Sequence, residues 1–240
     1  SIANGIKTDT FTFFLLFFYS NIIGLNPGLA GTAIFIALCV DAFTDPLMGT
    51  ISDRTNTSFG RRHPYMFISF IPMSLGYIFL FAPRQDWDMS QSDLFVWMTI
   101  FTILTRIGMT LFDIPHRAFG GEITKNYNER TLLMSWREMF AWVAGLSNAF
   151  LGYGVFFAST PEFPQGQLNP DAWFPFALTG ALIMIISVLY SSLSTKNEIN
   201  SLSKWSGSIA LGAILNELKI ALGNKSFLIF FFGNLFLSLA

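Results

Sequence analysis

Six long apolar stretches most strongly limit what this chain can fold into. Each has about the 20 mostly apolar residues that an α-helix needs to cross the hydrocarbon core of a bilayer. A further apolar run begins near Phe227 and reaches Ala240. The pattern predicts an all-α membrane protein with six spanning helices and the start of a seventh. The six expected spans are Thr8–Gly24, Leu29–Ser52, Pro64–Ala82, Leu94–Glu122, Thr131–Phe157 and Trp173–Ser194.

The low charge content supports a membrane environment. Asp, Glu, Lys and Arg make up 12% of the 240 residues, about half their share in a typical soluble domain. The formal net charge of −1 gives no electrostatic reason to expect nucleic acid as a partner. Cys39 is the single cysteine, which excludes an internal disulfide and a cysteine-based zinc site. The lipid bilayer is the expected surrounding, and no cofactor is expected.

Basic residues collect on alternate connections between the spans. Arg54, Arg61 and Arg62 follow the second span, Arg130 follows the fourth, and Lys196 follows the sixth. The positive-inside rule makes these connections cytoplasmic. We therefore expect a multi-pass protein of the cell membrane (inner or plasma membrane) whose N-terminus is cytoplasmic.

The segment after the sixth span forms a separate part of the predicted organisation. Residues 1–195 would form a six-helix bundle, 196–226 a cytoplasmic linker, and 227–240 the start of a seventh spanning helix. Within the linker, Leu211, Leu215 and Leu222 recur at helical spacing. This spacing predicts an amphipathic helix, either lying on the membrane surface or in a soluble linker.

Ionisable residues inside the spans are candidates for function, because a charge within a bilayer costs several kcal/mol. Counting from the basic end of each span, Asp45 is seven residues in, Asp41 eleven, Asp113 nine and Arg137 seven. At 1.5 Å per residue, these groups and Thr110 fall in one layer about two helical turns thick. The full set of candidates is Asp9, Asp41, Asp45, Arg106, Asp113, Arg117, Arg137 and Glu138.

Helical spacing also predicts which way these groups face. Asp41 and Asp45 stand at i and i+4 and share one helix face. Arg106, Thr110, Asp113 and Arg117 form one polar stripe on the fourth span, and such a stripe must face protein or water. Pro46 and Pro115 lie beside the acids and each removes a helical hydrogen bond. Interrupted helices at this depth are typical of transporter binding sites.

The chemistry of this layer favours a cation. Carboxylates with the hydroxyls of Thr44 and Thr110 provide oxygen ligands for a hard metal ion such as sodium. Crowded carboxylates would equally well hold a proton. The alternative is that Asp41, Asp45 and Asp113 only form ion pairs that hold helices together.

Several motifs resemble those of a known family. Gly49-Thr-Ile-Ser-Asp53-Arg54 followed by Gly60-Arg61-Arg62 resembles the signature loop of the major facilitator superfamily. Asp41-Ala-Phe-Thr-Asp45-Pro46 resembles the second-helix motif of its glycoside–pentoside–hexuronide:cation symporters. Asp113-Ile-Pro115-His116, Glu129-Arg130-Thr131 and Arg137 resemble the fourth and fifth helices of the same family. The resemblance implies twelve spans with alternating access, of which this chain would supply the N-terminal six-helix bundle.

The resemblance also implies roles for single residues. Asp41 and Asp45, with Thr44 and Thr110, match positions that bind the coupling cation, and Asp113 and Arg137 match positions that contact sugar. The signature loop would form a conformational latch that stabilises the outward-facing state. The residues implied for this latch are Gly49, Asp53, Arg54, Gly60, Arg61 and Arg62, and Glu122 and Arg130, between the fourth and fifth spans, are the expected partners.

Three positions depart from the family pattern. Gly5 stands where a related permease has an acid, and Asp9, one turn later, is the expected substitute. Arg117 replaces an aromatic residue, and Met109 replaces a tyrosine. Arg106, Arg117 and Arg137 would instead suit a carboxylate or sulfonate, since guanidinium groups pair well with both.

The leading hypothesis is a secondary transporter, not an enzyme. It would couple sodium or a proton to the symport of a sugar, glycoside or acidic sugar derivative, and act as a monomer when full length. The runner-up is a same-fold transporter of a lipid-like or organic anionic solute. A remote alternative is a membrane prenyl transferase that holds magnesium at Asp41 and Asp45, although the chain shows only Asp113 as a facing acid.

Overall fold

The computed structural model describes residues 2–124, 126–196, 223–226 and 228–229. The chain divides into two units, Ser1–Lys204 and Trp205–Ala240. The predicted linker with its amphipathic helix (196–226) and the predicted start of a seventh span (227–240) lie almost entirely outside the described residues. The long helices of the described residues all belong to the first unit.

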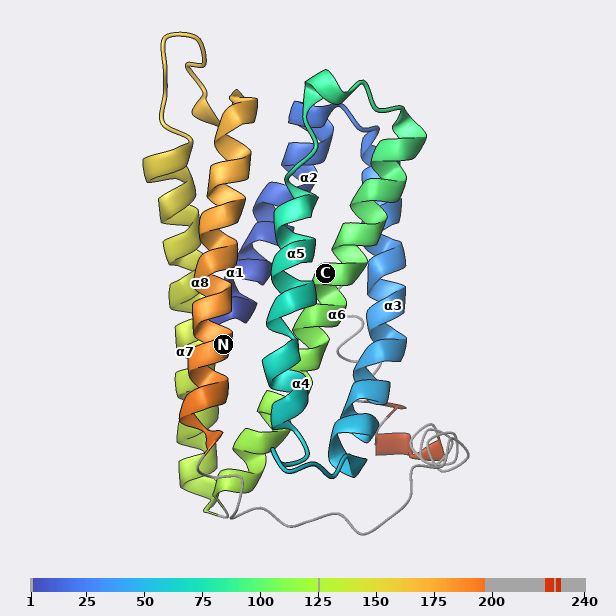
Figure 1. Ribbon diagram of the computed structural model, residues 1–240, viewed down its shortest axis with the longest axis vertical. Helices are drawn as coiled ribbons and strands as arrows, with labels where there is room; N and C mark the ends of the chain where they lie inside the picture. Colours follow the sequence, from blue (N-terminus) through green and yellow to red (C-terminus); the bar gives the residue numbers. More distant parts are fainter. Residues whose placement is uncertain (1, 125, 197–222, 227, 230–240) are drawn as a thin grey trace. The chain divides into compact units, whose positions relative to one another are not determined.

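Regular structure in the described residues is helical throughout, which confirms the predicted fold class (Figure 1). Five helical stretches there are long and apolar enough to cross a bilayer. They are α3 (Pro27–Arg54), α4 with α5 (His63–Ile68 and Phe70–Leu80), α6 (Gln91–Ile123), α7 (Tyr127–Leu151) with a π-helical end (Gly152–Phe156), and α8 (Trp173–Ser194). Short 3-10 turns cover Gln85–Trp87, Gly166–Leu168 and Pro170–Ala172.

The first predicted span is the most irregular helical segment. It consists of α1 (Ile2–Asp9), a π-helical turn (Thr10–Phe14), α2 (Leu15–Phe17) and a second π-helical turn (Phe18–Ile23). The helix begins at Ile2 rather than at the expected Thr8, so Lys7 is part of it. Interruptions were expected at Pro46 and Pro115, but α3 and α6 continue through both prolines. One missing hydrogen bond is compatible with a continuous helix when the turns on either side remain bonded.

The helix ends are fixed by side chains that cap them. Asn26 accepts a hydrogen bond from the amide of Gly28 (2.8 Å) at the start of α3, where Pro27 occupies the first helical position. Ser90 and Asp93 form a capping box at the start of α6. Caps of this kind satisfy the free amides of the first turn.

The connections alternate between the two ends of the bundle. Figure 1 shows the α3–α4 connection, the junction of α6 with α7 and the end of α8 at one end, and the other connections at the opposite end. His63 Nε2 lies 3.1 Å from Thr195 Oγ1, which joins α4 to the end of α8. The basic connections therefore share one end, as their alternation predicts.

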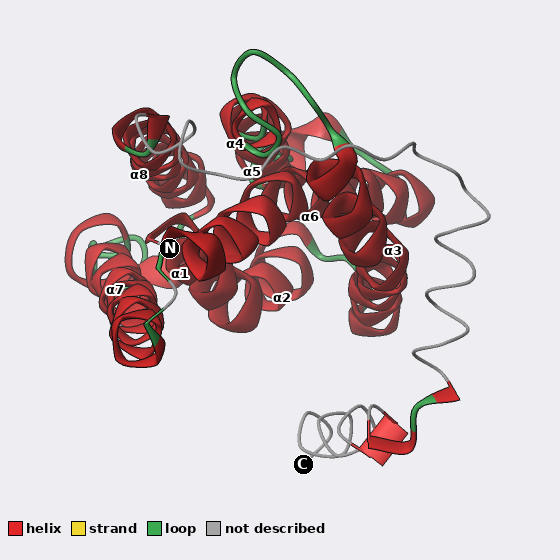
Figure 2. Ribbon diagram, turned by 90° about the horizontal axis from the view of Figure 1, so that it is seen from below, coloured by secondary structure: helices red, strands yellow, loops and turns green. Residues whose placement is uncertain are grey.

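A cluster of buried aromatic rings fills the end of the bundle opposite the basic connections. Trp173 is fully buried, and its ring stacks on Phe81 at 6.0 Å and contacts Phe157 at 4.6 Å between centroids. Phe14 and Phe18 complete the contacts from the first helical segment. Viewed along the bundle, α1 and α2 lie centrally, between α7 and α6 (Figure 2). This arrangement brings α1 close to the polar faces of α3 and α6.

Candidate functional site

A polar cavity of about 160 Å³ lies between α1, α3 and α6. Three carboxylates and three cationic side chains line it, so the charges balance. Met109, Ile114 and Asn4 complete the lining. The structure thus brings together six residues that the sequence singled out and adds Lys7. The ionisable and hydroxyl groups of the lining are Lys7, Asp41, Asp45, Arg106, Thr110, Asp113 and Arg117.

Each of the three carboxylates has a different partner. Asp41 forms an ion pair with Arg106. Asp45 Oδ1 accepts a hydrogen bond of 2.6 Å from the hydroxyl of Thr110. Asp113 pairs with Arg117 at 2.5 Å and lies 3.6 Å from Arg137 Nη1. Among the three, Asp45 is the one that meets a neutral group.

The cavity contains polar atoms whose hydrogen-bonding capacity is not used. Asp41 Oδ1, Arg106 Nε and Asp113 Oδ1 are buried and have no hydrogen-bond partner. Unpaired buried polar atoms are costly, and a ligand that satisfies them recovers that cost. Within the described part of the chain, no three His, Cys, Asp or Glu side chains converge as metal ligands.

Lys7 is the residue of this site that the sequence reasoning missed. Its ammonium lies 6.0 Å from the centroid of the Phe11 ring, and the guanidinium of Arg106 lies 5.5 Å from the same ring. Both distances are within the range of cation–π attraction. Lys7 and Phe11 are four residues apart, a spacing that places both on one helix face. The expected first span began at Thr8, so it included Phe11 but not Lys7.

Two predicted residues lie away from the cavity lining. The carboxylate of Asp9 accepts a hydrogen bond of 2.9 Å from Asn148 on α7. The hydroxyl of Thr44 is 3.5 Å from the backbone carbonyl of Asp41. Neither residue is among those lining the cavity.

Arg137 and Glu138 form a neighbouring pair on α7. Arg137 Nη2 donates to Glu138 Oε1 at 2.6 Å. The side chain of Arg137 is 8% exposed, whereas that of Glu138 is 57% exposed. Arg137 therefore faces the protein and reaches Asp113 from outside the cavity lining.

The signature loop forms a compact ion cluster at the basic end. Arg62 donates to Asp53 (2.5 Å) and to Glu122 (2.9 Å), and Arg61 also pairs with Glu122. Gly60 has a φ of +78°, a left-handed conformation that glycine adopts without strain. The cluster thus ties the ends of α3 and α6 to the start of α4. The guanidinium of Arg130 donates instead to the backbone carbonyl of Thr124 at 3.3 Å.

The remaining latch positions lie on α3. Gly49 faces Ile114 of α6, and a Cβ added there would make an ordinary contact of 3.7 Å. Arg54 is the last residue of α3.

Replacing Arg62 by alanine should destabilise the fold by about 2–3 kcal/mol, because its side chain is 4% exposed, Asp53 would lose its partner and Glu122 would keep only Arg61. Thermal unfolding in detergent measures the loss. Arg84→Ala is the matched control, since its ion pair with Asp171 is exposed on both sides and should contribute at most about 1 kcal/mol. Equal losses for both variants would show that the Arg62 cluster stabilises the fold no more than an exposed ion pair does.

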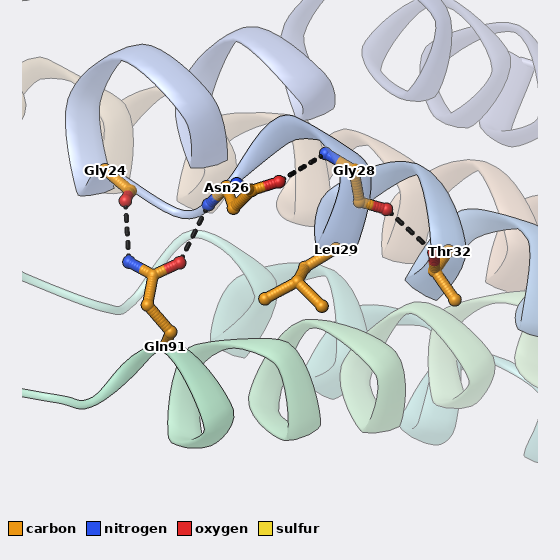
Figure 3. Close-up of a pocket in the computed structure, with 6 residues that line it drawn as sticks. All are labelled: Gly24, Asn26, Gly28, Leu29, Thr32 and Gln91. Atoms are coloured by element: carbon orange, nitrogen blue, oxygen red, sulfur yellow. Dashed lines mark hydrogen bonds between the residues drawn. The ribbon is translucent and has the colours of Figure 1, made fainter.

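A second hollow of about 620 Å³ lies at the opposite end of the helices (Figure 3). The side chain of Gln91 donates to the carbonyl of Gly24 and accepts from the amide of Asn26, both at 2.8 Å. These bonds fasten the turn before α3 to the first turn of α6. Gln91 therefore helps to fix the spacing of the two helices that carry the carboxylates.

Comparison with known proteins identifies the family. The family model described as MFS/sugar transport protein matches residues 1–240. The chain belongs to this family. Together with its apolar helices, membership makes the chain part of a multi-pass membrane protein, and it confirms the resemblance read from the motifs.

Three relatives of this chain are named as symporters. An uncharacterized symporter of Synechocystis sp. is 32% identical over 81% of this chain and 35% of its own length. A putative glycoside/cation symporter of Escherichia coli is 27% identical over 93% of the chain and 46% of its own length. A sodium-dependent lysophosphatidylcholine symporter of Danio rerio is 32% identical over 62% of the chain and 28% of its own length. The chain therefore spans less than half the length of each of these relatives.

Proposed function

We propose that this chain is the N-terminal bundle of a cation-coupled symporter for a small solute. The cavity of three carboxylates between α1, α3 and α6 is the observation that carries the proposal. Asp45 and Asp41, with the hydroxyl of Thr110, would bind sodium or a proton. An entering cation would reduce the negative charge around Asp113 and so change how Asp113 and the arginines meet the solute. Reciprocity requires the solute to tighten cation binding by the same factor.

The solute of this proposal is a sugar, glycoside or acidic sugar derivative, with the acidic kind preferred. Lys7, Arg106 and Arg117 all line the cavity, and guanidinium groups pair with carboxylates and sulfonates through parallel hydrogen bonds. Arg117 is half exposed, so it is available to a solute entering from outside the bundle. Asp113 and Arg137 would contact the solute from the other side.

A lipid-like or organic anionic solute is the second candidate. The lysophosphatidylcholine symporter named above supports it, and the guanidinium groups of the cavity suit a phosphate group as well as a carboxylate. A membrane prenyl transferase finds no comparable support, since the relatives described above are named as symporters.

The proposed arrangement in the cell follows from the distribution of basic residues. The end that carries Arg54, Arg61 and Arg62 would face the cytoplasm of a cell or plasma membrane. The cluster of Arg62, Asp53 and Glu122 would then close the cytoplasmic side and break when the transporter opens inward. The functional unit would be a monomer of the complete polypeptide.

Uptake into proteoliposomes tests the proposed function. The complete polypeptide that carries this sequence would be assayed with methyl glucoside, methyl glucuronide, a sulfonated glucoside and lysophosphatidylcholine. Each would be measured with an inward sodium gradient, an inward proton gradient and no gradient. We expect gradient-driven accumulation of an acidic glycoside in preference to its neutral counterpart. Uptake of every solute without any dependence on either gradient would contradict symport.

A further inference from the structure

Arg106 occupies a position that a coupling cation would need. On α6 it lies one turn before Thr110 and two turns before Asp113, and its guanidinium pairs with Asp41 of α3. The side chains of Arg106 and Asp41 are 12% and 21% exposed. A charged group of the protein therefore already neutralises one of the two α3 carboxylates.

The contact between Arg106 and Asp41 is incomplete. A guanidinium and a carboxylate can form two parallel hydrogen bonds, but here Arg106 Nη1 meets Asp41 Oδ2 alone. Asp41 Oδ1 and Arg106 Nε are both buried without a hydrogen-bond partner. A pair held through one contact is more easily exchanged than a two-bond fork.

The guanidinium of Arg106 also lies near a second group that attracts it. The Phe11 ring, in the π-helical turn after α1, lies 5.5 Å from its guanidinium carbon. A cation–π contact retains part of the stabilisation when the carboxylate is lost. Release of Asp41 therefore does not leave the arginine without a favourable contact.

We propose that Arg106 is a tethered competitor of the coupling cation at Asp41. This inference rests on the proposed function and adds a residue that sets the affinity for the ion. With Arg106 on Asp41, an entering cation meets Asp45 and Thr110. Full binding between Asp41 and Asp45 requires the cation to displace the guanidinium. Asp41 and Asp45 therefore bind the cation less tightly than they would without Arg106. The weaker binding allows the ion to be released again during transport.

Ion affinity in Arg106 variants tests the proposal. Sodium binding to the complete polypeptide would be measured by titration calorimetry, and proton binding by the pH of half-maximal uptake. For the ion that the wild type binds, R106Q should tighten affinity at least about tenfold, which corresponds to about 1.4 kcal/mol. R106K keeps the positive charge, so its ion affinity should stay closer to that of the wild type. It also provides a second measurement at this position if R106Q does not fold.

Two controls separate competition at Asp41 from a general loss of positive charge. R117Q removes a charge from the same cavity, but Arg117 pairs with Asp113 and not with Asp41. R117Q should therefore tighten ion binding less than R106Q does, because the charge that it removes does not contact Asp41. In a D41N background, R106Q should cause no further tightening, as a double-mutant cycle would show.

The outcomes distinguish this proposal from symport itself. Unchanged or weaker ion affinity in R106Q, or an equal effect in R117Q or in the D41N background, would overturn the role of Arg106. A wild-type protein whose uptake depends on neither sodium nor pH would instead overturn the proposed symport.

Discussion

Asp45→Asn is expected to abolish the accumulation of solute driven by a cation gradient. Asp41 and Asp113 pair with arginines, whereas Asp45 accepts a hydrogen bond from neutral Thr110. Its charge is therefore the most available to an ion. Removing a charge about 4 Å from a bound cation costs about 4 kcal/mol at an effective dielectric constant of 20. That loss corresponds to a roughly thousandfold weaker ion affinity.

The measurement is uptake by vesicles that contain the complete polypeptide, with and without an imposed gradient. Asp45→Asn should still exchange solute across the membrane without a gradient, because the side chain keeps its size. Asp171→Asn is a suitable control, since Asp171 is 74% exposed and pairs with Arg84 at the surface. Gradient-driven accumulation that persists in Asp45→Asn would place the cation elsewhere.

The positions of residues along regular helices could be predicted from the sequence. Asp41 and Asp45 share a face of α3, and Arg106, Thr110, Asp113 and Arg117 share a face of α6, as their spacing indicates. These predictions succeed because a regular helix fixes the direction of each side chain. The grouping of basic connections at one end follows equally from counting spans.

The contacts between helices could not be predicted. Pairing of Arg106 with Asp41 and of Thr110 with Asp45 depends on how far α3 and α6 slide and rotate against each other. Spacing along one helix contains no information on this. Lys7 was missed for another reason, since α1 already includes Ile2–Thr8, before most of the apolar run.

Asp9 lies on the same face of α1 as Gly5, as expected, but that face does not line the cavity. It was expected on the same face as Gly5, and both do contact α7, Gly5 at Ala141 and Asp9 at Asn148. The face of α1 that lines the cavity instead carries Asn4 and Lys7. The orientation of α1 about its own axis, which no single-helix pattern reveals, decides the difference.

Gly5→Asp should destabilise the bundle by more than about 3 kcal/mol, although one related permease is expected to have an acid at this position. A Cβ atom at Gly5 would clash with the carbonyl oxygen of Ala141 and lie 2.8 Å from its carbonyl carbon. Overpacking typically costs 1–3 kcal/mol when side chains can move. Here the obstacle is the backbone of α7, so α1 and α7 would have to separate. Thermal unfolding in detergent measures the effect.

Gly5→Ala is the sharper variant, because it adds one methyl group and no charge. It should already lower the unfolding temperature, whereas Gly31→Ala should leave it unchanged or raise it. Gly31 lies in α3 and has no heavy atom within 4 Å of an added Cβ, and alanine is the better helix former by about 0.5–1 kcal/mol. If Gly5→Ala and Gly31→Ala unfold alike, α1 does not cross α7 at Gly5. An acid such as that of the related permease would then have room at this position, and its absence here would need another cause.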